Sequence, residues 1–194
     1  MQKIVSQESK SKKQRRNQLI IGIILIGLML VSVGGYAFYG QASDSSGLQK
    51  IKYNGYEFNL QNEYWVLKLG GYTFGFSNRP DSTNYSSEGF LNGLDSYSGK
   101  PLYIDSTNNE ASYQISMNLD QVVQRIQPAC VENSSCVKDS PELPIKTCDD
   151  NLLIIMESNF SSIRQENNCV YIEGNNEEIL SLVDEFLYKI IGVK

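Results

Sequence analysis

The sequence predicts an α+β fold, in which an N-terminal transmembrane helix precedes one extracytoplasmic domain with a mostly antiparallel sheet and two packed helices. Three observations predict it: a long uncharged apolar run, alternating hydrophobic residues around turn dipeptides, and two later segments with hydrophobic residues at helical spacing. The predicted division is a basic tail over residues 1–18, a transmembrane helix over 19–39, a linker over 40–48 and a domain over 49–194.

The apolar run covers residues 19–39 and reads LIIGIILIGLMLVSVGGYAFY. At about 1.5 Å per residue, this length matches the roughly 30 Å hydrocarbon core of a bilayer. Residues 1–18 hold six Lys and Arg against one Glu, a net charge of +5, whereas the rest of the chain carries −10. The positive-inside rule then predicts a single-pass cell-membrane protein with a cytoplasmic N-terminus and a C-terminal domain outside. A signal peptide cleaved near residues 40–42 is the alternative.

The position of the basic tail beside the apolar run favours lipid headgroups over nucleic acid. The lipid bilayer is therefore a predicted partner through residues 19–39, and no nucleic-acid partner is expected.

The composition excludes several chemistries. The chain has no His, so catalysis by a Ser-His-Asp or Cys-His set and histidine metal sites are ruled out. Four cysteines allow three pairings, and spacing alone does not choose among them. We expect Cys130 with Cys136, which closes a small loop, and Cys148 with Cys169, which joins two predicted strands. The spacing matches neither a zinc site nor a redox CxxC pair, and no metal or cofactor is predicted.

Three N-x-S/T sequons suit an exported surface, although they also arise by chance in a chain rich in Asn and Ser. The glycosylation candidates are Asn84, Asn133 and Asn159.

The first part of the domain predicts a four-stranded antiparallel meander over residues 50–76. Apolar residues recur at every second position on both sides of Asn54-Gly55 and Gly70-Gly71, which favour two-residue hairpin turns. A polar excursion of about twenty residues follows Pro80.

Later segments predict strands and two helices. Strands are expected at residues 102–104, 152–156 and 169–172, the second of them buried on both faces. Hydrophobic residues from Ile115 to Ile126 predict a helix that ends before Pro128, and a last helix is expected between an Asn cap at 175 or 176 and Gly192.

Two stretches, YNGYEFNLQNEYWVLKLGGYTFGF and NCVYIEGNNEEILSLVDEFLYKIIGV, resemble segments of uncharacterised single-span surface proteins of archaea. In those proteins a basic N-terminus and one membrane helix precede a β-rich domain with paired cysteines. The resemblance implies an archaeal-type envelope protein and supplies no catalytic residue.

Acidic residues flank the predicted strands. Acids at strand ends are typical of metal-dependent phosphodiesterases and two-carboxylate glycosidases. The candidate catalytic residues are Asp105, Asp149, Asp150, Glu157 and Glu173. Acids in these places are more often simply solvated.

Aromatic side chains of the meander could form a sugar-binding or peptide-binding platform. The alternation assigns Trp65, Tyr72 and Phe74 to the packed face and leaves Tyr64 available.

The leading interpretation is a non-enzymatic, membrane-anchored binding or accessory protein with a protein or envelope partner outside the membrane. The first alternative is a carboxylate- or metal-dependent hydrolase acting there. The second is a pilin-like surface subunit, disfavoured because Asn17-Gln18 precedes the apolar run and no acid lies within it.

Overall fold

The computed structural model describes residues 18, 20–26, 29 and 49–194, and the chain divides into two compact units, residues 1–47 and 48–194. The prediction of a transmembrane helix over residues 19–39 is corrected, because the described residues include no helix long and apolar enough to cross a bilayer. Residues 19, 27–28 and 30–39 of the predicted span, and residues 1–17 of the basic tail, lie outside the described residues. The fold described below is that of residues 49–194.

The predicted antiparallel meander is confirmed. Its strands pair in chain order, and they are β1 (Lys50–Tyr53), β2 (Tyr56–Gln61), β3 (Tyr64–Leu69) and β4 (Tyr72–Phe76). Both central residues of each turn have positive φ, at Asn54-Gly55, Asn62-Glu63 and Gly70-Gly71. Such turns match the twist of paired strands, so the turn dipeptides fix the register that buries one face.

Six of the later strands form a second sheet that is mostly parallel, and the expected antiparallel arrangement is wrong there, while β8 (Cys130–Val131) and β9 (Ile145–Lys146) pair only with each other. Its order is β5-β11-β12-β10-β6-β7, and β11–β12 is its only antiparallel pair. The strands are β5 (Ser87–Glu88), β6 (Pro101–Ser106), β7 (Arg125–Pro128), β10 (Leu152–Glu157), β11 (Ser162–Glu166) and β12 (Cys169–Gly174). The central strand β10 is buried on both faces, as its apolar sequence predicts.

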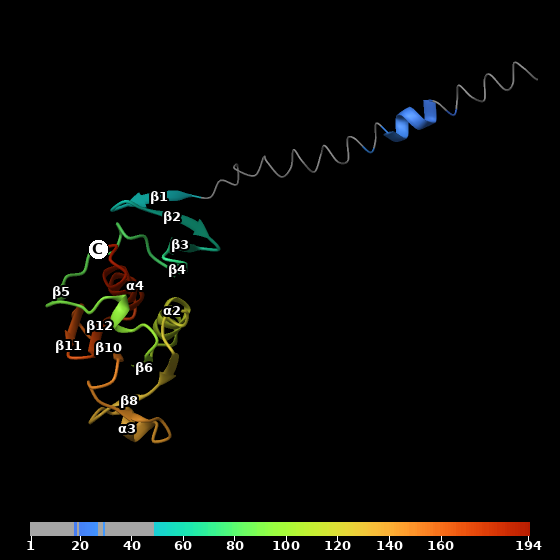
Figure 1. Ribbon diagram of the computed structural model, residues 1–194. Coiled ribbons are helices and arrows are strands. Elements are labelled where there is room, and N and C mark those ends of the chain that lie inside the picture. The colour runs from blue at the N-terminus through green and yellow to red at the C-terminus, as the bar shows by residue number, and fades with distance from the viewer. Residues whose placement is uncertain (1–17, 19, 27–28, 30–48) are drawn as a thin grey trace, which may run out of the picture. The chain divides into compact units, whose positions relative to one another are not determined.

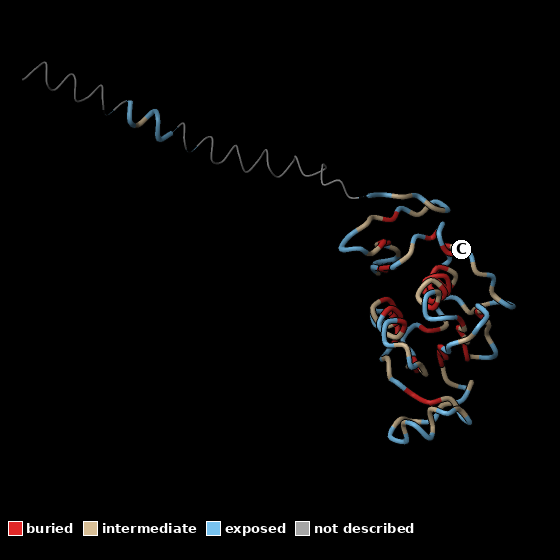
Figure 2. Tube along the Cα trace, turned by 180° about the vertical axis from the view of Figure 1, so that it is seen from behind, coloured by how far each residue is buried: buried red, intermediate tan, exposed pale blue. Residues whose placement is uncertain are grey.

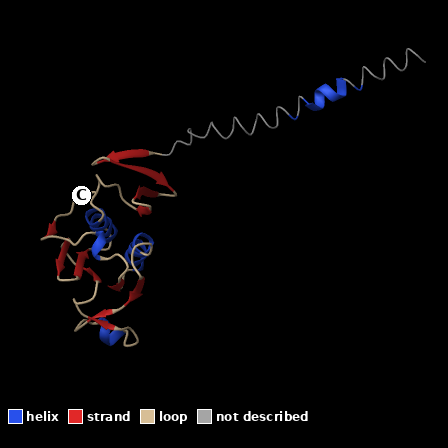
Figure 3. Ribbon diagram, in the orientation of Figure 1, coloured by secondary structure: helices blue, strands red, loops and turns tan. Residues whose placement is uncertain are grey.

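Two helices lie between the meander and the second sheet (Figures 1 and 3). Helix α2 (Asn109–Leu119) begins earlier and ends earlier than predicted. Its start is fixed by the side chain of Asn108, which accepts from the amide of Ala111. The last three apolar positions of the expected stripe lie outside the helix, Val122 and Val123 in the turn after it and Ile126 in β7. Helix α4 (Ile179–Ile190) follows Asn175, whose Oδ1 accepts from the amides of Glu177 and Glu178. The helix ends two residues before Gly192, whose φ is positive.

Buried residues concentrate where the helices meet both sheets (Figure 2). Phe58 and Phe76 of the meander pack on Tyr188 of α4, with ring centroids 5.9 and 4.1 Å from that of Tyr188. A smaller cluster on the other face of the second sheet includes Tyr103 and Ile154, and lies under the disulfide-bearing segment between β7 and β10. That segment contains β8 (Cys130–Val131), the short helix α3 (Cys136–Asp139) and β9 (Ile145–Lys146).

Helix α2 and the turn that follows it cover the edge of β4 that faces away from β3. Asn118 accepts from the amide of Gly75 at 2.8 Å and donates to its carbonyl at 2.8 Å, and Gln121 makes the same pair of bonds with Thr73. The side-chain amides at helical spacing thus replace a fifth strand. They protect an edge that would otherwise be free to pair with another chain.

A buried carboxylate links the two helices to the end of β4. Asp184 of α4 is fully buried and accepts from the amide of Asn78 at 2.8 Å and from Nε2 of Gln114 at 2.7 Å. Burial raises the pKa of Asp184 to about 6, although these hydrogen bonds favour the ionised form. The folded state therefore holds more protons than the unfolded chain between about pH 4 and pH 6.

We expect Asp184 to make the free energy of unfolding fall as pH rises through this window, by at most about 3 kcal/mol. The measurement is urea denaturation of the full chain at pH 4, 5, 6 and 7, compared with Asp184→Asn, which does not titrate. The difference between the two proteins should shift between pH 4 and 6 and stay constant above it. Parallel pH profiles would contradict the assignment.

Candidate functional site

Three of the five candidate carboxylates lie at one edge of the second sheet. Asp105 is near the end of β6, Glu157 ends β10, and Glu173 is near the end of β12. Because β6, β10 and β12 are parallel, their carboxyl ends meet at the same edge. Asp149 and Asp150 precede β10 and therefore lie at the opposite edge.

At that opposite edge, Asp150 forms an ion pair with Lys146 at 3.3 Å. The ammonium group of Lys146 lies 4.0 Å from the ring centroid of Tyr103, and Arg125 donates to the Tyr103 hydroxyl at 3.1 Å. Lys146 and then Arg125 lower the pKa of that hydroxyl. The charged and hydroxyl groups of these residues thus pair with one another, and they line none of the cavities described in this section.

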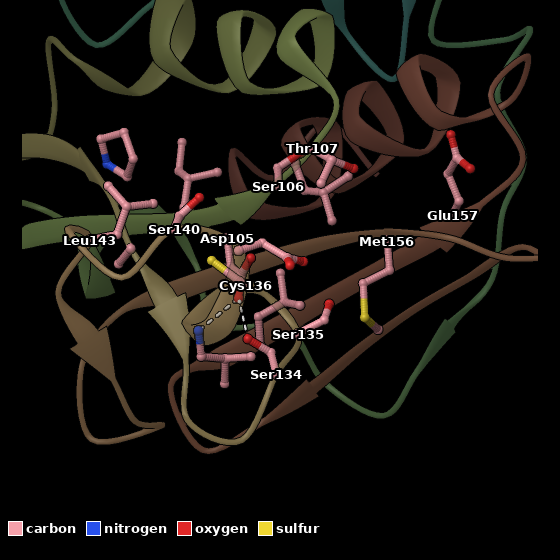
Figure 4. A pocket seen from close by; sticks show the side chains of 17 residues that line it. Asp105, Ser106, Thr107, Ser134, Ser135, Cys136, Ser140, Leu143, Met156 and Glu157 are labelled. Atoms are coloured by element: carbon pink, nitrogen blue, oxygen red, sulfur yellow. Dashed lines mark hydrogen bonds between the residues drawn. The ribbon is translucent and has the colours of Figure 1, made fainter.

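A cavity of about 390 Å³ opens at the carboxyl ends of β6 and β10. After β6 the chain continues to β7 on one side, whereas after β10 it continues to β11 and β12 on the other. The chain therefore diverges between these two strands, which is where open parallel sheets bind their ligands. Asp105 and Glu157 both line this cavity, together with Ser106, Thr107 and Met156 (Figure 4).

The outer wall of the cavity is the disulfide-bearing segment. Cys130 is bonded to Cys136, as expected, and Ser134, Ser135 and Ser140 line the wall. Asp105 accepts from the amide of Val131 at 2.7 Å and from Oγ of Ser134 at 3.4 Å (Figure 4). The carboxylate thus ties this wall to the sheet. The second expected disulfide, Cys148–Cys169, joins the start of β12 to the segment before β10.

Two more cavities continue the first along the same edge. One of about 450 Å³ shares Thr107 and Glu157 with it and adds Asn108, Asn109, Glu110 and Asn176. Another of about 340 Å³ shares Glu157 and Asn176 with the second and adds Ser158, Asn159 and Asn175. We call the three together the carboxyl-edge groove. Glu157 lines all three parts and stands at its centre.

The charge of this groove has one sign. Its lining carboxylates are Asp105, Glu110, Asp139 and Glu157, and the residues that line its three parts include neither Lys nor Arg. The remaining polar lining consists of Ser, Thr and Asn side chains. Such a surface repels anions and offers both donors and acceptors to a neutral ligand.

The other candidate residues have different surroundings. Glu173 accepts from Oγ of Ser162 at 3.2 Å and lies 3.7 Å from Arg164, so it is paired within the sheet and lines no part of the groove. Within residues 18, 20–26, 29 and 49–194, no group of three His, Cys, Asp or Glu side chains could hold a metal ion. Nothing among the described residues therefore favours the metal-dependent form of the hydrolase hypothesis.

The aromatic platform is largely core. Trp65 and Phe74 are buried and Tyr72 packs partly against the same core, as the alternation predicts. Tyr64 lines a separate surface cavity with Tyr113, so it remains available. The three sequon residues, Asn84, Asn133 and Asn159, are all exposed, and their glycosylation stays a prediction.

The asparagines of the groove were not among the residues predicted to form a site. Asn108 caps α2, which begins at Asn109, and Asn175 and Asn176 stand just before α4, so all four appear as ordinary residues of a helix start. Their position directly after β6 and β12 was the available signal, because residues that follow parallel strands gather at one edge.

Comparisons with known proteins give no match. No family model matches the chain, and no curated protein and no solved structure matches it. The resemblance to archaeal surface proteins therefore stays a prediction.

Proposed function

We propose that residues 49–194 form a non-catalytic binding domain that works outside the cytoplasm and takes its ligand in the carboxyl-edge groove. The observation that carries this proposal is the first cavity of the groove. It lies where the chain diverges between two parallel strands, and a disulfide-closed loop forms its wall.

The rigidity of this wall supports binding. The loop from Cys130 to Cys136 is held at two points, by its disulfide and by the hydrogen bonds to Asp105. A wall that is already in place loses little conformational freedom when a ligand binds. Asp105 acts here as a positioning residue for the wall.

The two disulfides support the location. All four cysteines of the chain are paired, and disulfides persist in oxidising compartments outside the cytoplasm. A partner protein or an envelope component is then the expected source of the ligand.

Methyl resonances of methionine test this proposal on the full chain. Met156 lines the first cavity, whereas Met117 contacts β4 and lies outside the groove. We expect solubilised cell-envelope material of the producing organism to shift the ¹³C-methyl resonance of Met156 and to leave that of Met117 in place.

The ligand should be recovered chemically unchanged, and hydrolysis that is lost in Asp105→Ala and Glu157→Ala would favour the hydrolase instead. An unmoved Met156 resonance, or equal shifts at both methionines, would contradict binding in the groove. Met156→Leu and Met117→Leu assign the two resonances.

A further inference from the structure

We propose that the ligand of the carboxyl-edge groove is a neutral oligosaccharide. This inference rests on the proposed binding function and adds the chemical class of the ligand. Three adjoining cavities of about 390, 450 and 340 Å³ favour an extended ligand over one compact molecule.

The charge of the groove excludes anionic ligands. Four carboxylates and no Lys or Arg line the groove, so an acidic polysaccharide or a phosphate-bearing ligand would meet repulsion without a compensating cation. Residues 48–194 as a whole carry eleven Lys and Arg against twenty Asp and Glu, a net charge of −9, so the field of the domain acts in the same direction.

The hydrogen-bonding groups of the groove favour a ligand with many hydroxyl groups. Carboxylates only accept, amide side chains both donate and accept, and hydroxyls do either. Sugar hydroxyls also do both, so a run of them can satisfy Glu157, the asparagines beside it and the serines of the wall together. A single ammonium group would satisfy one carboxylate and could not accept a hydrogen bond from the amide side chains of the second and third cavities.

The direction of the groove separates a sugar chain from a peptide. Extended peptides are usually bound by adding a strand to a free sheet edge, where main-chain groups form a ladder. This groove instead crosses the ends of β6 and β10 and continues to the residue after β12, so each element contributes side chains at one point. A ligand that is read by side chains at spaced points suits this arrangement.

Apolar surface is present where sugar rings would need it. Leu143, Ile154 and Met156 line the first cavity. Phe160 is 70 % exposed and directly follows Ser158 and Asn159, which line the third cavity. The carbon-bound hydrogens on the face of a pyranose ring pack on such surfaces while its hydroxyls point to the polar rim. The mixed lining therefore matches both sides of a sugar.

The test is calorimetric titration of the full chain with neutral hexasaccharides of glucose, mannose and N-acetylglucosamine, with hexagalacturonic acid and spermidine as charged comparisons. We expect at least one neutral hexasaccharide to bind, and neither charged probe to bind as tightly. Glu157→Ala and Asn176→Ala should each weaken its binding about tenfold, because each removes a hydrogen-bonding side chain from the centre of the groove.

The matched controls are Glu57→Ala and Asn59→Ala in β2 of the meander, which should leave the affinity unchanged, and unchanged melting temperatures would show that all four variants are folded. The absence of binding by every neutral hexasaccharide, or tighter binding of either charged probe, would overturn the sugar assignment. If no hexasaccharide binds but envelope material still moves the Met156 resonance, the proposed binding function stands and only the sugar assignment fails. If neither experiment detects a ligand, both proposals fail.

Discussion

Asn118→Ala is expected to lower the free energy of unfolding by about 2 kcal/mol, because it leaves the buried N–H of Gly75 without a partner. The C=O of Gly75 loses one of its two donors and keeps Nε2 of Gln114 at 3.0 Å. Asn118 is fully buried and makes both bonds at 2.8 Å. The measurement is equilibrium denaturation of the full chain in urea. No part of this effect requires a change in the hydrophobic core.

Gln121→Ala is the matched control for Asn118→Ala. Gln121 makes the same two bonds to Thr73, but these bonds are exposed and water can replace the side chain. We expect it to cost less than about 1 kcal/mol. Equal effects of the two variants would show that burial of the edge of β4 does not determine the cost.

Replacing Cys148 and Cys169 together by alanine is expected to cost about 3 kcal/mol of stability, since this disulfide closes the longer loop, with a sequence separation of 21 residues. Ligand binding at the carboxyl-edge groove should survive, because this disulfide lies at the amino ends of β10 and β12, the edge of the sheet opposite to the groove. Urea denaturation measures the loss of stability, and calorimetric titration with the neutral hexasaccharides named above measures binding.

The double replacement of Cys130 and Cys136 by alanine should show the reverse pattern. Their separation is six residues, which predicts a smaller cost of about 2 kcal/mol, but the loop they close is the wall of the first cavity. The affinity for the ligand should therefore fall in this variant, although its free energy of unfolding falls less than in the Cys148 and Cys169 variant. A loss of binding in the Cys148 and Cys169 variant alone would contradict the position of the site.

The meander could be predicted because its signals are local. Alternation over β1 to β4 and the dipeptides at Asn54-Gly55 and Gly70-Gly71 lie within a few residues of the contacts that they specify. The second sheet lacks such signals. The run from Leu152 to Met156 indicates a buried strand, but its partners β6 and β12 are chosen by tertiary packing, so the parallel pairing could not be inferred.

The same limit applies to the candidate site. Asp105 and Glu157 line one cavity, and the sequence places both at or just after the end of a predicted strand. Asp149 and Asp150 also flank a predicted strand, but they stand at its start. In the parallel sheet that forms, residues before a strand and residues after it lie at opposite edges.

Helix α2 shows how a periodic pattern can continue past a helix. Val122 and Val123 are buried in the turn after α2, and Ile126 lies in β7, so the apolar spacing extends beyond Leu119. The capping side chain of Asn108 determines the start of the helix. Residues that pack in a turn can copy helical spacing without being helical.

Photo-crosslinking inside the producing cells tests most directly whether a ligand occupies the carboxyl-edge groove. Photo-methionine replaces methionine with little change of shape, and it places a reactive group at Met156 in the groove and at Met117 outside it. We predict an adduct that disappears in Met156→Leu and persists in Met117→Leu. The same adducts in both variants, or none that depends on Met156, would contradict a ligand in the groove.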